Sequence, residues 1–89
     1  MEIKRNATAG TMESSDVYVE IQPGDGAVEI TLESVVKQQF GEAIRAAALD
    51  VLAQQNVNSA KVHIVDRGAL ECVLRARVET AAKRGGEEA

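Results

Sequence analysis

Hydrophobic and polar residues alternate in two segments of the N-terminal half, residues 16–21 and 27–32. A period of two is typical of a strand that buries one face. Between the segments, the sequence PGDG at residues 23–26 supplies the restricted and positive φ values of a tight turn. The pattern therefore predicts a β-hairpin.

The spacing of apolar residues then changes to three and four, from Phe40 to Leu52. This spacing predicts an amphipathic helix. The first residue of the helix is open between 35 and 39, because the valines there can equally prolong the preceding strand. Asn56 tolerates the left-handed conformation that ends many helices, so the helix is expected to end near it.

Alternation returns at residues 60–65 and predicts another strand. The last block, residues 69–84, fits two patterns. A helix would place Arg77 within its apolar stripe, so we favour a fourth strand, followed by a loose tail at residues 85–89. The predicted fold class is α+β, a small antiparallel sheet with one packed helix in the order ββαββ; the alternative is ββαβα, with a C-terminal helix.

The chain has 89 residues, which is the size of a single small domain. Residues 1–15 are rich in small and polar side chains and predict a flexible leader or a short edge strand. Hydrophobic residues make up 45% of the chain but aromatic residues only 2%, so the core must be aliphatic and thin. Such a core gives modest stability, which makes protein partners an expectation.

Charge and cysteine content exclude several classes of function. A net charge of -4 is the wrong sign for a nucleic-acid or anionic-membrane protein. The single cysteine, Cys72, excludes an internal disulfide and fits a reducing compartment, so the expected location is the cytoplasm. No apolar segment approaches the ~18 residues of a membrane span, and no export signal is expected.

Residues that could catalyse a reaction are few. The sequence has no phosphate-binding glycine motif and no nucleophile elbow, and one histidine with one cysteine cannot form a metal site. We expect His63 on the polar side of a strand and Cys72 as a small core residue. An enzyme that acts alone is therefore disfavoured.

Two arginines form a candidate anion site. Arg75 and Arg77 lie two residues apart, so on a strand they would project from one face and could hold a phosphate. By pattern alone, they could equally pair with Glu20 or Glu29 across the sheet. Both interpretations depend on residues 69–84 forming a strand.

The segment TMESSD at residues 11–16 combines hydroxyl and acidic side chains before the first strong strand. Such a segment is typical of a turn or a strand entry, and it could also be a functional serine loop. Composition and spacing do not decide between these interpretations.

Four segments carry a resemblance to a known family. They are AGTMESSD at 9–16, QQFGEAI at 38–44, LDVLAQQNV at 49–57 and DRGALECVLRARVE at 66–79. Together they resemble the acyl carrier proteins, or gamma subunits, of bacterial citrate lyase, in register over nearly the whole chain. This resemblance favours the functional interpretation of the serine segment.

The resemblance implies a modified serine, which corresponds to Ser14. In the family, this serine carries 2'-(5''-phosphoribosyl)-3'-dephospho-CoA through a phosphodiester, so the carrier is a phosphoprotein. Family members commonly have glycine after this serine, whereas this chain has Ser15. Arg75 or Arg77 would then contact phosphates of the attached group or an acidic surface of a partner.

The resemblance also implies a role in citrate fermentation without catalysis by the chain itself. An alpha subunit, the transferase, exchanges the acetyl group on the carrier for citrate, which releases acetate and leaves a citryl thioester. A beta subunit, the lyase, cleaves this thioester to oxaloacetate and regenerates the acetyl carrier. A separate prosthetic-group transferase modifies the serine. The alternatives are the carrier subunit of a related system such as malonate decarboxylase, and a non-catalytic interaction module in which Ser14 is an ordinary turn residue.

Overall fold

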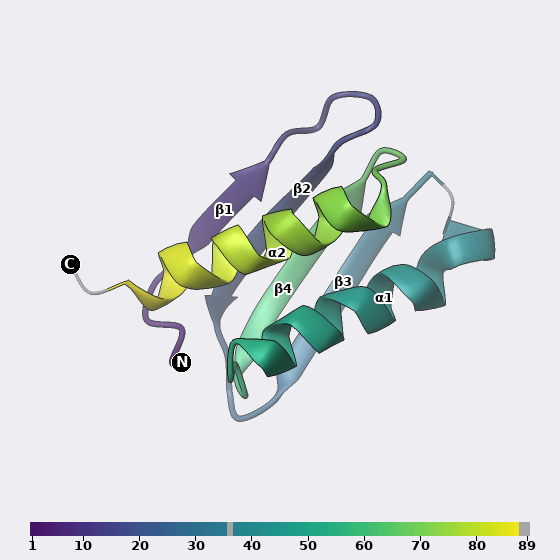
Figure 1. The fold of residues 1–89 in the computed structure, drawn as a ribbon. Helices are drawn as coiled ribbons and strands as arrows, with labels where there is room; N and C mark the ends of the chain where they lie inside the picture. Colours follow the sequence, from purple (N-terminus) through teal and green to yellow (C-terminus); the bar gives the residue numbers. More distant parts are fainter. Residues whose placement is uncertain (36, 88–89) are drawn as a thin grey trace.

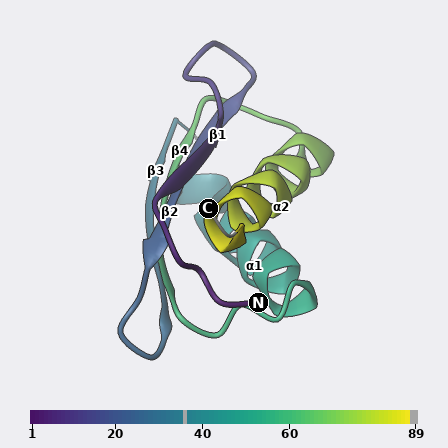
Figure 2. The ribbon, with the colours of Figure 1, turned by 90° about the vertical axis from the view of Figure 1, so that its left-hand side faces the viewer.

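The described residues form one four-stranded sheet and two helices, and both helices lie on the same face of the sheet (Figures 1 and 2). The computed structural model describes residues 1–35 and 37–87. The elements in chain order are β1 (Ala7–Gly10), β2 (Val17–Pro23), β3 (Val28–Ser34), α1 (Lys37–Gln54), β4 (Ala60–Asp66) and α2 (Glu71–Gly86). The predicted α+β class is confirmed.

The predicted β-hairpin is wrong, because β2 and β3 are not neighbours. The strand order is β1-β2-β4-β3, and β4 lies between the two strands that the turn connects. Pro23 at the end of β2 and Val28 at the start of β3 both align with Ala60 of β4. β3 and β4 run parallel, connected through α1, so the sheet is mixed and not wholly antiparallel.

The strand predicted in residues 69–84 is wrong, because Glu71–Gly86 form the helix α2. The residues of α2 that are buried share one helical stripe: Leu74, Val78, Ala81, Ala82 and Gly85. Arg77 lies beside this stripe, and its long side chain carries the charged group out to the surface. The order is βββαβα, which has the C-terminal helix of the alternative and an additional first strand.

The core lies between the sheet and the helices and is aliphatic throughout. Its largest fully buried side chains come from four elements: Val17, Val19, Ile21, Leu52, Ile64 and Val78. The opposite face of the sheet carries polar side chains, including Glu20 and its cross-strand neighbour His63. His63 is half-buried there and lies 2.6 Å from a carboxylate oxygen of Glu33, which confirms its predicted polar-side position.

The two ends of the described chain pack together. Ile3 is buried, and the backbone N–H groups of Lys4 and Arg5 donate to the carbonyl oxygen of Gly85 at 2.8 and 3.2 Å. Residues 1–15 thus include a buried side chain and the edge strand β1. Residues 85 and 86, expected in the loose tail, instead form the last turn of α2, and residues 88–89 lie outside the described chain.

The predicted limits of the first helix agree with the structure. α1 begins at Lys37, within the range left open, and ends at Gln54. Asn56 follows with a φ of 57°, which is the left-handed conformation expected of it. Val36, which could have prolonged the strand, lies outside the described residues.

Candidate functional site

Residues 11–16, which we call the serine loop, connect β1 to β2 at the end of the sheet where β4 leads into α2 (Figure 1). Ser14 and Ser15 are both exposed in this loop. Among the described residues, the hydrogen bonds of the loop do not use the Ser14 hydroxyl. This hydroxyl is therefore open to an enzyme that approaches from solvent.

The interior of the serine loop is fixed by Thr11 and Glu13. The Thr11 hydroxyl donates to Oδ2 of Asp16 at 2.6 Å and accepts from the backbone N–H of Glu13 at 3.2 Å. The backbone N–H of Asp16 donates to the carbonyl oxygen of Glu13 at 3.1 Å. These short-range bonds give the segment before and after Ser14 a defined turn geometry.

The serine loop is also anchored to the residue that follows β4. The N–H of Ser15 donates to the carbonyl oxygen of Arg67 at 2.8 Å, and the N–H of Arg67 donates to the carbonyl oxygen of Asp16 at 2.9 Å. Ser15 has a φ of 64°, in the left-handed region that glycine adopts most easily. Ser14 is thus one residue away from a backbone contact that ties the loop to the sheet.

Asp16 links the loop to α2. Its Oδ1 accepts from the backbone N–H of Val17 at 2.7 Å, and Arg77 donates from Nε to Oδ1 at 3.2 Å and from Nη2 to Oδ2 at 3.1 Å. The Thr11 hydroxyl, then the Val17 N–H, and then the Arg77 guanidinium lower the pKa of Asp16 from 3.8 to about 2. The Asp16 carboxylate is therefore ionised at neutral pH, and it bonds to both the serine loop and α2.

Gly10 lets the backbone and Arg77 pass closely at the base of the loop. Gly10 has a φ of 90°, and a Cβ at this position would lie 1.8 Å from the carbonyl oxygen of Val17. The same Cβ would lie 3.2 Å from Cδ of Arg77. Glycine is required here both for its conformation and because no side-chain atom fits.

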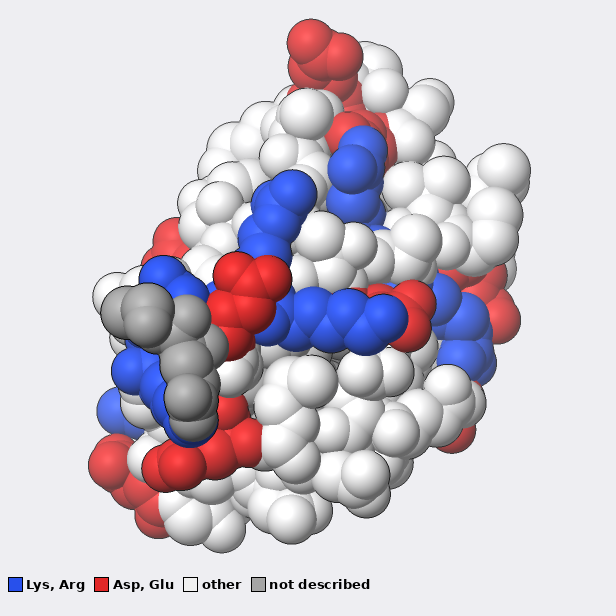
Figure 3. Space-filling view, turned by 60° about the vertical axis from the view of Figure 1, so that its left-hand side comes forward, with Lys and Arg blue, Asp and Glu red and all other residues white. Residues whose placement is uncertain are grey.

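The predicted pairing of Arg75 with Arg77 on one face is wrong. On a helix, two residues apart means a rotation of roughly 200°, so the two side chains project in different directions. Arg75 bonds to Asp50 at 2.7 Å and to Glu71 at 3.1 Å, and these carboxylates, Asp50 first, raise its pKa. Arg75 pairs with Asp50 and Glu71, and Arg77 pairs with Asp16. The predicted alternative partners, Glu20 and Glu29, are therefore wrong. Figure 3 shows one face of the molecule, on which basic side chains lie against acidic ones.

Arg67 is not among the site residues predicted from the sequence. Its backbone holds the serine loop, and its side chain is exposed. In the sequence, Arg67 stands in Asp66-Arg67-Gly68, which indicates only the end of a strand. The pairing of β2 with β4 brings it beside Ser15, so knowledge of that pairing was needed to find it.

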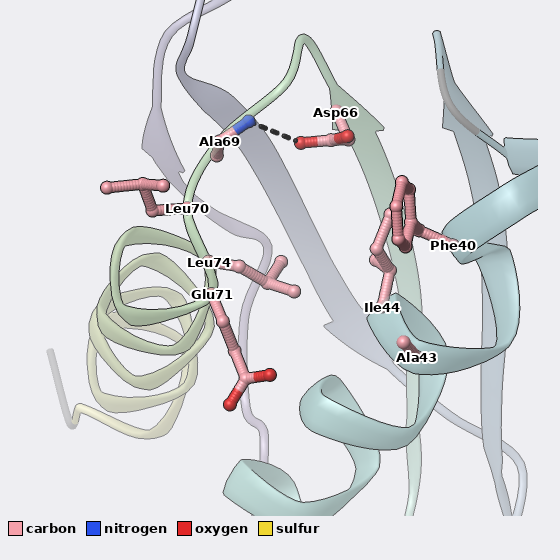
Figure 4. A pocket seen from close by; sticks show the side chains of 8 residues that line it. All are labelled: Phe40, Ala43, Ile44, Asp66, Ala69, Leu70, Glu71 and Leu74. Atoms are coloured by element: carbon pink, nitrogen blue, oxygen red, sulfur yellow. Dashed lines mark hydrogen bonds between the residues drawn. The ribbon is translucent and has the colours of Figure 1, made fainter.

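An open groove of about 280 Å³ lies between the first turns of the two helices (Figure 4). Phe40 and Ile44 line it from α1, and Leu74 points into it from α2. Phe40 is 54% exposed although it belongs to the apolar stripe, and Leu70, 72% exposed, points away from Phe40. The groove is mainly apolar.

Cys72 is exposed, so its prediction as a core residue is wrong. The helical spacing of α2 directs Leu74 and Val78 inward and leaves Cys72 outside the buried stripe. Among the described residues, His, Cys, Asp and Glu side chains form no group that could hold a metal ion. Within the same part of the chain, neither helix has the length and hydrophobicity needed to cross a membrane.

The chain matches a class of carrier proteins. A family model of acyl carrier proteins, described as "Malonate decarboxylase delta subunit (MdcD)", matches residues 4–85. A chain in the "Crystal structure of a Pseudomonas malonate decarboxylase hetero-tetramer in complex with malonate" has the same fold, with a TM-score of 0.79 at 21% identity over 97% of this chain and 89% of that one. These matches define the class as a small acyl carrier protein.

Curated relatives give the particular family. The citrate lyase acyl carrier protein of Escherichia fergusonii is 55% identical over 99% of this chain and 92% of its own length. Those of Klebsiella pneumoniae and Lactiplantibacillus plantarum are 51% and 48% identical over 99% and 98% of this chain, and over 92% and 91% of their own lengths. The chain therefore belongs to the family of citrate lyase acyl carrier proteins.

Proposed function

We propose that this protein carries the acyl group of citrate lyase on a prosthetic group attached to Ser14. One structural observation carries the proposal: Ser14 presents an exposed hydroxyl on a loop whose neighbouring residues are fixed to β4 and α2. An accessible hydroxyl on a fixed loop is suited to a modifying enzyme, which must position one oxygen for reaction. The relatives at about half identity, named citrate lyase acyl carrier proteins, support the same role.

The group that we propose is 2'-(5''-phosphoribosyl)-3'-dephospho-CoA, linked to Ser14 through a phosphodiester. The residues present fit this group, because the Ser14 hydroxyl can form the ester and the adjacent Arg67 offers an exposed cation. Once attached, the group supplies a terminal thiol that holds acetyl or citryl groups as thioesters. The chain itself holds the attachment point in place and leaves the space around it open.

A non-catalytic role is consistent with the positions of the reactive side chains. His63 contacts Glu33 on the polar face of the sheet, and Cys72 lies on the outer side of α2. Within the described residues, neither takes part in the hydrogen bonds of the serine loop. We propose that the chemistry is performed by partner subunits, as the name of the relatives, acyl carrier proteins, suggests.

We propose three protein partners in the cytoplasm. A prosthetic-group transferase attaches the group to Ser14. The alpha subunit exchanges the acetyl group for citrate and releases acetate, and the beta subunit cleaves the citryl thioester to oxaloacetate and regenerates the acetyl thioester. Tethering raises the effective concentration of the acyl group at each active site, so the carrier needs no tight binding of free substrate. The solved neighbour of the same fold belongs to a hetero-tetramer, which supports a carrier that works within an assembly.

The malonate decarboxylase carrier is the second candidate. The description of the family model and the structural neighbour both favour it. However, the structural neighbour is only 21% identical, whereas the Escherichia fergusonii citrate lyase relative is 55% identical. We therefore rank citrate lyase first. A plain interaction module, in which Ser14 is never modified, ranks below both.

The proposal is tested with Ser14→Ala and the matched control Ser15→Ala, each reconstituted with alpha and beta subunits after treatment with the prosthetic-group transferase. We expect Ser14→Ala to fold and assemble but to release no oxaloacetate from citrate, and Ser15→Ala to retain turnover. Citrate cleavage by Ser14→Ala would disprove the assignment of this serine. Turnover only with malonate decarboxylase subunits would select the second candidate.

A further inference from the structure

The chain has six arginines, and five of them have a side-chain partner in the structure. The partnered arginines and the groups they contact are Arg5 with Glu87, Arg45 with the Ile30 carbonyl, Arg75 with Asp50 and Glu71, Arg77 with Asp16, and Arg84 with the Thr8 carbonyl. For the guanidinium of Arg67, the described residues provide neither a hydrogen bond nor an ion pair. Arg67 is therefore available for an anion from outside the chain.

The position of Arg67 is fixed although its side chain is exposed. Its N–H and carbonyl oxygen bond to Asp16 and Ser15, the two residues that follow Ser14. These are backbone contacts, so they do not depend on the identity of the side chain. The side chain that carries the unpartnered guanidinium therefore starts from a backbone position bonded to Ser15, the residue that follows Ser14.

The surroundings of Ser14 are otherwise unfavourable for an anion. Glu13 is exposed directly before Ser14, and the Asp16 carboxylate is two residues after it, with Arg77 already bound to that carboxylate. The whole chain has a net charge of -4. A phosphodiester at Ser14 would add negative charge to this acidic loop, and a guanidinium is the side chain best shaped to donate hydrogen bonds to two phosphate oxygens.

We propose that the guanidinium of Arg67 binds the phosphate group through which Ser14 is modified. This inference rests on the proposed function, because it requires the phosphodiester at Ser14. In the modified protein, Arg67 offsets the charge of Glu13 and fixes the direction in which the attached group leaves the loop. Arg75 and Arg77, the arginines that the sequence suggested for phosphate, remain in their internal ion pairs.

The test detects the contact between Arg67 and the phosphate by NMR. The free energy of unfolding is not used, because an exposed ion pair contributes too little to it. The modified protein is prepared from cells that also produce the prosthetic-group enzymes, as the parent, Arg67→Gln and Arg5→Gln. Arg5 is the matched control, since it is an exposed arginine whose partner is Glu87. The ³¹P resonance of the Ser14 phosphodiester and the Arg Nε–Hε resonances are recorded by NMR.

We expect the Arg67 Nε–Hε resonance to shift between the unmodified and modified parent protein while that of Arg75 stays in place. We also expect Arg67→Gln to shift the ³¹P resonance and Arg5→Gln to leave it unchanged. A phosphodiester resonance that is identical in the parent and Arg67→Gln would overturn the inference and leave the proposed function standing. Absence of the phosphodiester from every variant, including the parent, would instead refute the proposed function, and with it this inference.

Discussion

The guanidinium of Arg77 on α2 contacts both carboxylate oxygens of Asp16, which ends the serine loop, at 3.2 and 3.1 Å. The two residues are 61 positions apart in the sequence. The last helix of the chain therefore holds the loop that carries Ser14, and Gly10 leaves room for the Arg77 side chain to cross. The geometry of the serine loop, the proposed modification site, depends on the complete fold and not on the loop alone.

We expect Asp16→Asn to have a lower free energy of unfolding than the parent protein at pH 7. This difference should shrink as the pH falls. The pKa of Asp16 is about 2 in the folded protein, whereas its ordinary value is 3.8. As the pH falls, this carboxylate is therefore protonated in the unfolded chain before it is protonated in the folded protein. The stabilisation by the charged form is complete above the ordinary value and is lost as the pH falls towards 2. Urea unfolding of the parent and of Asp16→Asn at pH 7, 4, 3 and 2 measures the free energy of unfolding of each protein.

Asp25→Asn is the control for that series, because Asp25 also loses one negative charge but lies in an exposed turn, 3.4 Å from Lys61. The difference between the parent and Asp16→Asn should narrow between pH 4 and pH 2. A difference that stays constant across the series would show that the charge of Asp16 does not stabilise the loop.

We expect Ser15→Gly to stabilise the protein by about 0.5 to 1 kcal/mol. Ser15 has a φ of 64°, and the left-handed conformation costs a residue with a side chain roughly 1 to 2 kcal/mol, part of which glycine loses again through its freedom in the unfolded state. Ser14→Gly is the matched variant, because Ser14 does not have a positive φ, and it should not stabilise. Equal effects of the two variants in thermal unfolding would contradict the assigned loop conformation.

We expect Gly10→Ala to destabilise the protein far more than Gly26→Ala. Both glycines have positive φ values, 90° and 104°, so both variants carry a conformational cost of about 1 to 2 kcal/mol. At Gly10, the new Cβ would also collide with the Val17 carbonyl oxygen, whereas at Gly26 no heavy atom lies within 4 Å. Unfolding by denaturant measures both variants, and similar losses would show that β1 does not pack as described.

The sequence predicted the elements whose pattern has one interpretation. The three- and four-residue spacing predicted α1, and alternation predicted β2, β3 and β4. The alternation does not determine which strands pair, because β2 can bury one face with either β3 or β4 as its neighbour. The turn at residues 23–26 is a local feature and does not reveal that β4 lies between the two strands it connects.

The prediction of a strand in residues 69–84 is wrong for a physical reason. Arg77 precedes the buried Val78, and in the sequence alone a charge within an apolar stripe disfavours a helix. The length of the arginine side chain removes the conflict, since its stem lies over Gly10 and its charged end reaches Asp16. The error in this block also produced the errors on Cys72 and on Arg75.

The candidate site was only partly predictable. Pattern alone left the serine loop as a turn or a functional loop, and the family resemblance singled out Ser14. Arg67 could not be found in this way, because its place beside Ser15 follows from the pairing of β2 with β4. Contacts between segments about 50 residues apart leave no periodic signal in the sequence.

The measurement that tests the central claim most directly is the intact mass of the protein from cells that produce the prosthetic-group enzymes, followed by fragmentation of the peptide that contains residues 11–16. Ser15→Ala serves as the matched sample. We expect a mass increase equal to the phosphoribosyl-dephospho-CoA group, localised to Ser14 and retained in Ser15→Ala. An unmodified chain from these cells would contradict the claim that this protein is a citrate lyase carrier.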